Sequence, residues 1–138
     1  NALKEKNKNI KVYLSDPKGS SLYNYIKTKE FKSEGNSITE GIGSSRATKN
    51  FEKALIDDAY SIDDTTALTV LFDLIEKEGL SLGTSSGINV AGAIKLAQEL
   101  GPNKTIVTIL CDKSDRYQGK LFNKKFLMDK NLPYPRWL

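Results

Sequence analysis

Two short segments of the chain carry residue types that can take part in chemistry. Residues 83–87 read Gly-Thr-Ser-Ser-Gly, where glycines let the backbone approach a ligand and hydroxyls exchange hydrogen bonds with it. Residues 39–46 read Thr-Glu-Gly-Ile-Gly-Ser-Ser-Arg and set the carboxylate of Glu40 beside two glycines. Each segment also has a plain structural interpretation. Ser85 or Ser86 can cap a helix, and the second segment can be a solvated turn.

Composition restricts the chemistry available to these segments. The 138 residues contain no histidine and a single cysteine, Cys111, which excludes histidine-based triads, thiolate clusters and the commonest zinc sites. Four aspartates lack the alternating spacing of a calcium loop, so helix capping and solvation are the favoured interpretation; they are Asp57, Asp58, Asp63 and Asp64. Carboxylates, hydroxyls, backbone groups or an organic cofactor must therefore supply any chemistry, and we expect no metal site.

Charge and hydropathy narrow the range of partners. The net charge of +4 comes from lysines interspersed with acidic residues rather than from a basic cluster with aromatics, so we expect no nucleic-acid partner. No apolar run approaches the roughly 20 residues of a membrane span, and we expect no membrane partner. The lone cysteine gives no sign of an oxidising compartment, and we expect a cytoplasmic location.

The elements that position these segments alternate between strand and helix. A strand is predicted over 9–15, followed by a long irregular region over 35–50. A helix capped by Asp63 or Asp64 is predicted to end at Gly79, because apolar residues follow the spacing of one helical face.

A strand, loop, helix and strand are predicted next: a short strand over 80–82, the loop 83–87, a helix ended by Gly101-Pro102, and a buried strand over 105–110. The side of that helix that carries its apolar residues comprises Val90, Ala93, Ile94, Ala97 and Leu100. Residues 115–130 are predicted to be helical, and the proline-rich tail is predicted to lie on the surface with Trp137 anchored. The pattern favours one three-layer α/β domain with a mostly parallel sheet, and ligands of such sheets bind beyond the carboxyl ends of the strands.

Four stretches across the chain resemble the second half of the pyridoxal-phosphate-dependent cysteine synthase and cystathionine β-synthase family, which has fold type II. They are residues 2–7, Glu40 to Gly43, residues 77–80 leading to 83–87, and residues 105–110 leading to Asp115-Arg116-Tyr117. The resemblance implies that residues 1–138 are the C-terminal portion of the large cofactor-binding domain. It also implies a requirement for pyridoxal 5′-phosphate.

The resemblance assigns roles to three residues around the cofactor. Ser85 matches the serine that hydrogen-bonds the pyridine nitrogen, and a hydroxyl there, unlike an aspartate, does not enforce a protonated ring. Gly41 matches backbone that faces the cofactor and closes over the substrate. Cys111 falls where many relatives have a proline beside the ring, and we interpret it as a buried, unreactive packing thiol.

Three further residues are assigned to the substrate side. Glu40 matches the glutamate of cystathionine β-synthase-like members and is a candidate general acid or base, provided that burial raises its pKa. Gly43 shapes the same loop. Arg46 is either a surface arginine, the favoured interpretation, or a partner for a substrate carboxylate. The residues that follow Gly43 depart from the family pattern, which leaves the second-substrate pocket undefined.

The implied activity is β-elimination or β-replacement on cysteine, serine or O-acylserine, with sulfide as nucleophile or leaving group, and hydrogen sulfide release from cysteine is one version of it. The family's Schiff-base lysine and its substrate and phosphate loops match nothing in this chain; Lys113 is not in a matching context. We therefore expect a portion of a longer enzyme whose upstream half is its partner, within a homodimer that binds a small amino-acid substrate. The alternative is a non-catalytic fragment or stand-alone interaction domain.

Overall fold

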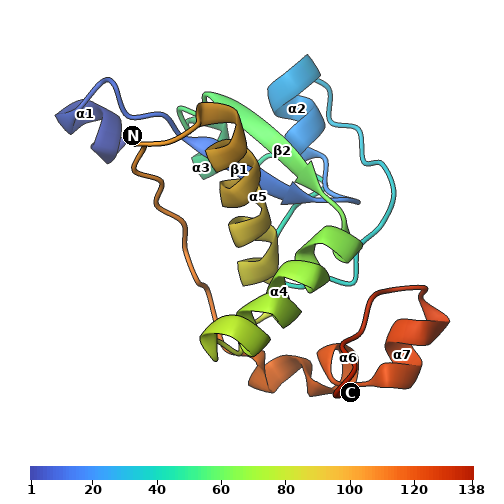
Figure 1. Ribbon diagram of the computed structural model, residues 1–138. Coiled ribbons are helices and arrows are strands. Elements are labelled where there is room, and N and C mark those ends of the chain that lie inside the picture. Colours follow the sequence, from blue (N-terminus) through green and yellow to red (C-terminus); the bar gives the residue numbers. More distant parts are fainter.

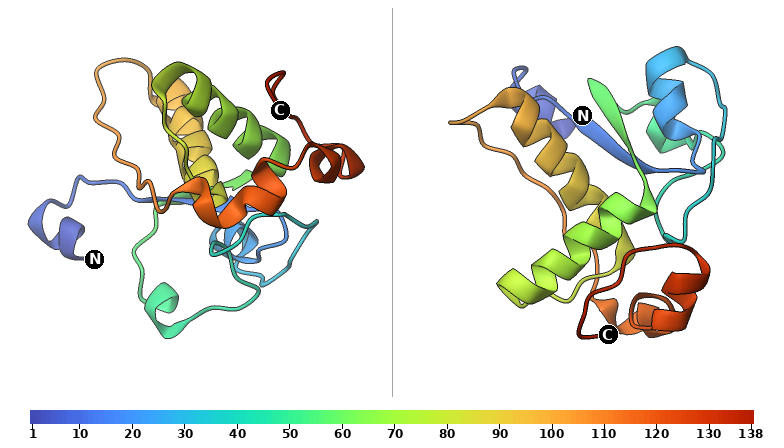
Figure 2. Two further views of the ribbon diagram at one scale, coloured as in Figure 1. Left: turned by 90° about the horizontal axis from the view of Figure 1, so that it is seen from below. Right: turned by 45° about the vertical axis from the view of Figure 1, so that its right-hand side comes forward.

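The computed structural model describes residues 1–138 and has three layers around a parallel pair of strands. Strand β1 (Tyr13–Pro17) pairs with β2 (Asp58–Ile62) in the register Tyr13 to Asp58 through Pro17 to Ile62. Helices α4 (Asp64–Glu78) and α5 (Thr84–Leu100) lie on one side of the pair, and α2 (Leu22–Thr28) lies on the other (Figures 1 and 2). The layering and the parallel pairing confirm the expected fold class, although the sheet of this chain has two strands only.

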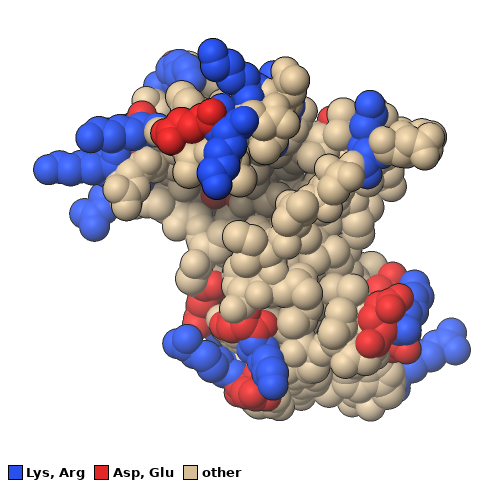
Figure 3. All heavy atoms as spheres, turned by 90° about the vertical axis from the view of Figure 1, so that its left-hand side faces the viewer, with Lys and Arg blue, Asp and Glu red and all other residues tan.

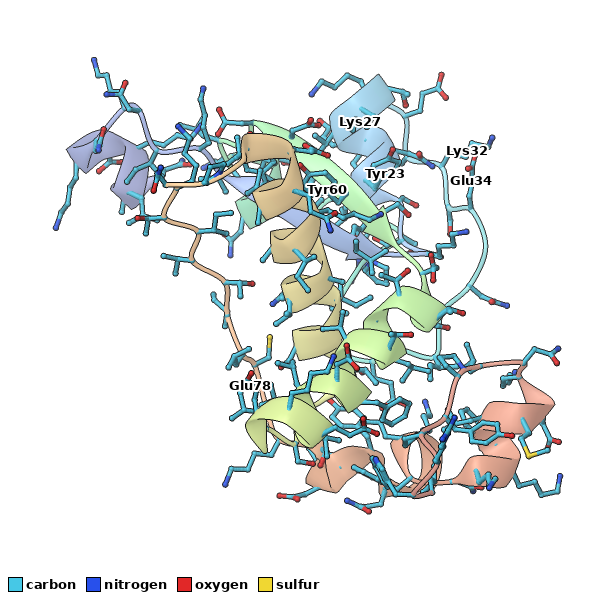
Figure 4. The ribbon with its side chains drawn as sticks, viewed as in Figure 1. Tyr23, Lys27, Lys32, Glu34, Tyr60 and Glu78 are labelled. Carbon is cyan, nitrogen blue, oxygen red and sulfur yellow. The ribbon has the colours of Figure 1, made fainter.

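The two strands differ from the prediction in position and number. β1 begins four residues later than predicted and extends through Asp16-Pro17, which were expected to end it. β2 was not predicted, because only Ala59 and Ile62 of its five residues are buried and its other side chains are polar or aromatic. Lys27, which lies on α2 (Figure 4), forms an ion pair with Asp58 at the start of β2, so charge also links the α2 layer to the sheet.

Helix α4 confirms its prediction at both ends. The Asp63 side chain accepts a hydrogen bond from the Thr66 backbone N–H at 2.8 Å, which satisfies one of the free donors of the first turn. Gly79 ends the helix in the left-handed conformation with φ +68°. The buried residues of α4 follow the helical period and are Ala67, Leu68, Leu71 and Phe72.

Helix α5 begins at Thr84, so residues 84–87 form its first turn instead of a separate loop. Its N-cap is Gly83, and neither Ser85 nor Ser86 caps it. Glycines bring α5 close to its neighbours: a Cβ on Gly87 would lie 2.8 Å from the Ala67 carbonyl oxygen of α4, and one on Gly92 would lie 1.8 Å from Ser15 Oγ of β1. The close approach of α5 to α4 and to β1 therefore depends on glycine, which has no side chain, at positions 87 and 92.

The packed face of α5 is not the predicted one. Its buried residues are Ile88, Ala91, Gly92 and Leu96, together with the first turn. Two residues of the side that was predicted to pack, Ile94 and Leu100, are each 43% exposed. The packed face of α5 thus combines small residues with Ile88 and Leu96, and nothing in this chain covers Ile94 and Leu100.

The C-terminal region forms three short helices instead of one. They are η1 (Ser114–Tyr117), α6 (Gln118–Leu121) and α7 (Lys124–Asp129). Tyr117, Leu121 and Leu127 form the larger core cluster together with three residues of α4, Leu68, Leu71 and Phe72. Trp137 donates from Nε1 to Glu76 at 2.8 Å and packs edge-on against Phe72, which confirms that the tail is anchored.

Two predicted strands are absent. Leu82 forms a single antiparallel bridge with Lys113, and residues 105–110 have no regular secondary structure. The prediction that 105–110 is buried is wrong for this chain, because Val107 is 87% and Ile109 69% exposed. β-branched residues form a strand only where a neighbouring strand pairs with them, and this chain supplies none beside 105–110.

The remaining helices lie at the surface. They are α1 (Ala2–Lys6) and α3 (Lys49–Glu52), neither of which has a buried residue. No helix combines the length and the apolar character that crossing a membrane requires.

Candidate functional site

The turn at residues 40–43 is built against the sheet by one apolar side chain and one glycine. Ile42 packs against the smaller core cluster, which contains Ile62 of β2 and Ile88 of α5. Gly43 has φ +82°, and a Cβ there would lie 2.9 Å from both Pro17 Cγ and Ser20 Cβ. Gly41 also has a positive φ, +76°, but open space surrounds it. The left-handed conformation thus favours glycine at both positions, and Gly43 is needed for space as well.

The loop residues 37–39, just before this turn, are held by Asp64, the first residue of α4. Its carboxylate accepts from the Ser37 hydroxyl, from the Ile38 backbone N–H at 2.9 Å and from the Thr39 hydroxyl at 3.4 Å. Three donors on one carboxylate fix the entry to the turn in place. The sequence analysis proposed Asp64 only as one of two possible helix caps, and Asp63 takes that role.

Glu40 forms an ion pair with Lys120 of α6, whose Nζ also lies 3.4 Å from the Ile38 carbonyl oxygen. The Glu40 side chain is 60% exposed, and hydrogen bonding and charge attraction from Lys120 lower its pKa below the ordinary value. The upward shift on which its predicted acid or base role depended is therefore absent, because Glu40 is not buried and faces a cation. In this structure Glu40 is an ionised residue that connects the turn to α6.

Ser85 lies in the first turn of α5 and is only 5% exposed. None of the side-chain hydrogen bonds of the chain involves its hydroxyl. The preceding Thr84 is 2% exposed, and its buried hydroxyl also has no partner. The neighbouring Ser86 differs, because its Oγ accepts from the Cys111 backbone N–H at 2.9 Å. Of the two adjacent serines, Ser86 has a hydrogen-bond partner within the chain. The Ser85 hydroxyl has none and can bond a group outside the chain.

The start of α5 is joined to the C-terminal helices through Asp112. The Gly83 N–H donates to the Asp112 carbonyl oxygen at 2.9 Å, and the Tyr117 hydroxyl donates to the Asp112 carboxylate at 2.7 Å. The bond with Asp112 raises the pKa of Tyr117. Since α6 follows η1 directly, the same C-terminal region contacts Gly83 through Asp112 and Glu40 through Lys120.

Cys111 and Arg46 are both at the surface. Cys111 is exposed, so the prediction of a buried thiol is wrong; it ends the uncovered segment 105–111, and no packed layer encloses it. Its position beside a cofactor ring stays a prediction. Arg46 is exposed, its backbone N–H bonds Ser44 Oγ at 3.2 Å, and its side chain forms no ion pair, which agrees with the favoured surface interpretation.

A polar hollow of about 390 Å³ lies beside the turn. Its walls come from residues 17–20 at the end of β1 and just after it, residues 35–37, Thr39 and residues 42–45. Hydroxyl groups are the commonest polar groups among them. Gly43 lines it, whereas Glu40, Gly41 and Ser85 do not. The predicted site residues are therefore divided between this hollow and the surface at the start of α5.

Comparison with known proteins places most of this chain within one family. The sequence profile of the family described as pyridoxal-phosphate dependent enzyme matches residues 1–112. The chain belongs to this pyridoxal-phosphate-dependent family. The match covers the 40–43 turn, α4, α5 and Cys111, so every predicted site residue lies inside it.

Individual relatives point to one branch of the pyridoxal-phosphate-dependent family. A cysteine synthase of Dictyostelium discoideum is 40% identical over 94% of this chain and 37% of its own length. An O-acetylserine dependent cystathionine beta-synthase of Bacillus subtilis is 36% identical over 86% of this chain and 36% of its own. The crystal structure of the Helicobacter pylori enzyme of that name superposes with a TM-score of 0.74 at 32% identity, over 86% of this chain and 36% of that one. The chain thus spans about a third of these relatives.

The residues present fit the ring end of pyridoxal phosphate. A nearly buried hydroxyl without a partner in the chain suits a single acceptor such as a ring nitrogen. The turn with Gly41 and Gly43 is held to the same helix, because Ile42 and Ile88 share one core cluster. Three residues that support these positions were not predicted as site residues: Asp64, Asp112 and Lys120. The family profile covers Asp64 and Asp112, whereas Lys120 lies beyond its end at residue 112.

Proposed function

We propose that this chain is the C-terminal part of the cofactor-binding domain of a β-replacement or β-elimination enzyme acting on cysteine, serine or O-acylserine. Sulfide would be the nucleophile in one direction and the leaving group in the other. The relatives named cysteine synthase and O-acetylserine dependent cystathionine beta-synthase support this substrate class. The single observation that carries the proposal is the unpartnered, nearly buried hydroxyl of Ser85 in a chain of the pyridoxal-phosphate-dependent family.

Bound pyridoxal phosphate supplies an electron sink for the bonds at the substrate α-carbon. Ser85 would donate its hydroxyl hydrogen to the pyridine nitrogen and hold the ring without adding a charge. A neutral donor leaves the ring a moderate electron sink, which suits loss of a β-substituent. The proposed role of Ser85 is therefore both positional and electronic.

The turn would act through its backbone and its charge. Gly41 has open space around it, so its backbone can approach a ligand without hindrance from a side chain. Glu40 would present a fixed negative charge near the substrate β-carbon, and its pairing with Lys120 would keep it ionised. The exposed guanidinium of Arg46 is a candidate partner for a substrate carboxylate from the same loop.

The remaining polypeptide is the proposed partner of this chain. The lysine that binds the cofactor would come from that part, since the relatives are about three times as long as the matched region. We also propose that the intact enzyme is a cytoplasmic homodimer. The second candidate is a non-catalytic interaction domain, which the large exposed side chains of 105–111 favour.

A full-length chimera tests the proposal. In it, this chain replaces the matched region of the Dictyostelium cysteine synthase, and purified protein is assayed with O-acetylserine, serine or cysteine, with and without sulfide. We expect the visible absorbance of lysine-bound cofactor and turnover of at least one of these substrates. Ser85→Ala should weaken cofactor binding by about 3- to 10-fold, the value of one neutral hydrogen bond.

Ser86→Ala is the matched control, because the Ser86 hydroxyl already accepts a hydrogen bond from the Cys111 N–H. It should lower stability and leave cofactor affinity unchanged. A chimera that folds but remains colourless and inactive would favour the non-catalytic alternative.

A further inference from the structure

Helix α5 begins at a residue that has no side chain with which to cap it. Gly83 is the N-cap of this 17-residue helix, and the backbone N–H groups of Thr84 and Ser85 have no acceptor in the chain. Helices commonly satisfy such donors with a side-chain oxygen of the N-cap residue itself. The start of α5 is therefore open to an oxygen atom, and to a negative charge, from another part of the chain.

Asp112 brings a carboxylate to this place. A Cβ on Gly83 would lie 2.1 Å from Asp112 Oδ1, so this oxygen occupies the space of the side chain that Gly83 lacks. The Asp112 carbonyl oxygen accepts from the Gly83 N–H at 2.9 Å, which fixes the two residues to each other. The Tyr117 hydroxyl donates to Asp112 Oδ2 at 2.7 Å and restricts the rotation of the carboxylate. The carboxylate is thus held against the end of the helix.

Residues 111–112 hold the first turn of α5 on both sides of Ser85. Before Ser85, the backbone of Gly83 is bonded to residue 112. After it, Ser86 Oγ accepts from the Cys111 N–H at 2.9 Å. The position of the Ser85 hydroxyl therefore depends on two consecutive residues that lie more than 20 places further along the chain.

Two enclosed polar atoms at the start of α5 have no partner. They are Thr84 Oγ1 and Asp112 Oδ1, and one other buried side-chain oxygen of the chain, Asp16 Oδ1, shares this condition. No lysine or arginine forms an ion pair with Asp112. An unpartnered carboxylate oxygen inside a protein is costly, and its presence calls for a role beyond packing.

The surface beside this end of α5 is poor in charge. The face of the molecule that residues 105–111 cross has an uncharged, hollowed waist (Figure 3). On that face lysine and arginine gather towards the α1 end, and charges of both signs gather at the opposite end. The N-terminus of a helix by itself favours an anion such as a phosphate group. The negative charge of Asp112 opposes this, so the start of α5 suits a neutral hydrogen-bond acceptor that meets a hydroxyl.

We propose that Asp112 is a positioning residue for the cofactor. Its carboxylate takes the place of the missing Gly83 side chain, Tyr117 holds the carboxylate there, and the first turn of α5 thereby keeps the Ser85 hydroxyl where it meets the ring nitrogen. Asp112 acts through this turn and not by contact with the ring. The inference rests on the proposed function, because it takes the ring nitrogen as the partner of Ser85.

The affinity of the cofactor-free, full-length Dictyostelium chimera for two ligands tests this role. The ligands are pyridoxal phosphate and 1-deazapyridoxal phosphate, which has a carbon atom in place of the ring nitrogen. The unsubstituted chimera should bind the deaza compound about 3- to 10-fold more weakly, the value of one neutral hydrogen bond, and Ser85→Ala should bind both equally. A general loss of stability cancels in the ratio of the two affinities, so a residue with a merely structural role leaves the ratio unchanged.

Two substitutions of the supporting residues should change this ratio although Ser85 is intact. Asp112→Ala removes the carboxylate, and Tyr117→Phe keeps the buried ring but releases the carboxylate. Both should bring the ratio close to one, and in the cofactor-free chimera the amides of 84–86 should exchange hydrogen at least about 10-fold faster. Asp115→Ala, at an exposed position two residues before Tyr117, is the control and should change neither quantity.

The outcomes separate this inference from the proposed function. A ratio close to one in the unsubstituted chimera would contradict the role of Ser85 and overturn both. A ratio that Ser85→Ala abolishes, but that Asp112→Ala and Tyr117→Phe leave intact, would overturn the positioning role alone. Loss of the ratio in Asp115→Ala as well would assign the effect to the C-terminal helices in general and would also overturn that role.

Discussion

Lys120 and Glu40 form an ion pair across 80 residues of sequence, and this pair joins helix α6 to the turn of Gly41 and Gly43. The turn is therefore held from two sides, by Lys120 at Glu40 and by Asp64 at residues 37–39. A segment without regular secondary structure is positioned here by charged side chains from two helices. The proposed substrate-facing turn thus depends on residues that need not touch a ligand.

Replacing Lys120 should release Glu40. In Lys120→Gln, the pKa of Glu40 should rise from its lowered value back towards the ordinary 4.5, because the cation that favours ionisation is gone. Carbon-13 NMR titration of the Glu40 carboxyl measures this, and amides of 36–46 should exchange faster. Lys125→Gln breaks the exposed pair with Asp129 and should alter neither quantity. An unchanged Glu40 titration in Lys120→Gln would show that the pair does not form in solution.

Alanine at the two turn glycines should have unequal costs. Gly41→Ala adds only the strain of a positive φ, about 1–2 kcal/mol, since nothing lies within 4 Å of its Cβ. Gly43→Ala adds the same strain and a clash with Pro17 and Ser20, a further 1–3 kcal/mol or so. Urea unfolding of the two variants measures the difference, and equal costs would argue against the contact of Gly43 with Pro17.

The contact of α5 with β1 predicts a sharp effect at Gly92. Gly92→Ala places a methyl group 1.8 Å from Ser15 Oγ and should destabilise the chain by roughly 1–3 kcal/mol. Gly119→Ala, in α6 with open space around it, should be neutral or stabilising by up to about 1 kcal/mol. Adding Ser15→Ala to Gly92→Ala should recover part of the loss in thermal or urea unfolding. Complete additivity of the two substitutions would contradict a direct contact.

Asp57 should stabilise the fold in a pH-dependent way. Its carboxylate bonds Lys4 at 2.5 Å and the Val12 N–H at 2.7 Å, and these bonds lower its pKa from 3.8 to about 2. A lowered carboxyl pKa stabilises the folded state above the unfolded-state value, and this contribution is lost as pH falls through the folded-state value. Wild type should exceed Asp57→Asn by roughly 1–2 kcal/mol at pH 7, and the two should converge near pH 2. A gap that persists at pH 2 would assign the effect to something other than ionisation.

Local sequence signals predicted the parts of the fold that depend on neighbouring residues. The cap at Asp63, the apolar spacing of α4 and the left-handed stop at Gly79 all lie within one helix and its ends. The tail anchored by Trp137 was likewise predicted, because a proline-rich segment cannot be helical and an indole seeks apolar contact.

Elements that depend on distant partners were predicted poorly. Residues 105–110 have strand propensity, but a strand also requires a neighbour, and none lies in this chain. β2 has weak propensity and becomes a strand because β1 lies beside it. At the candidate site, the free hydroxyl of Ser85 fits its predicted role, whereas the pKa of Glu40 has the opposite shift because Lys120 is 80 residues away in sequence.

The most direct test of the account is the nitrogen-15 NMR shift of ring-labelled pyridoxal phosphate bound to the full-length chimera. A hydroxyl donor at position 85 predicts a neutral, hydrogen-bonded nitrogen whose resonance moves in Ser85→Ala and changes to that of a protonated ring in Ser85→Asp. A resonance that is identical in all three proteins would mean that the ring nitrogen lies elsewhere and would contradict the account.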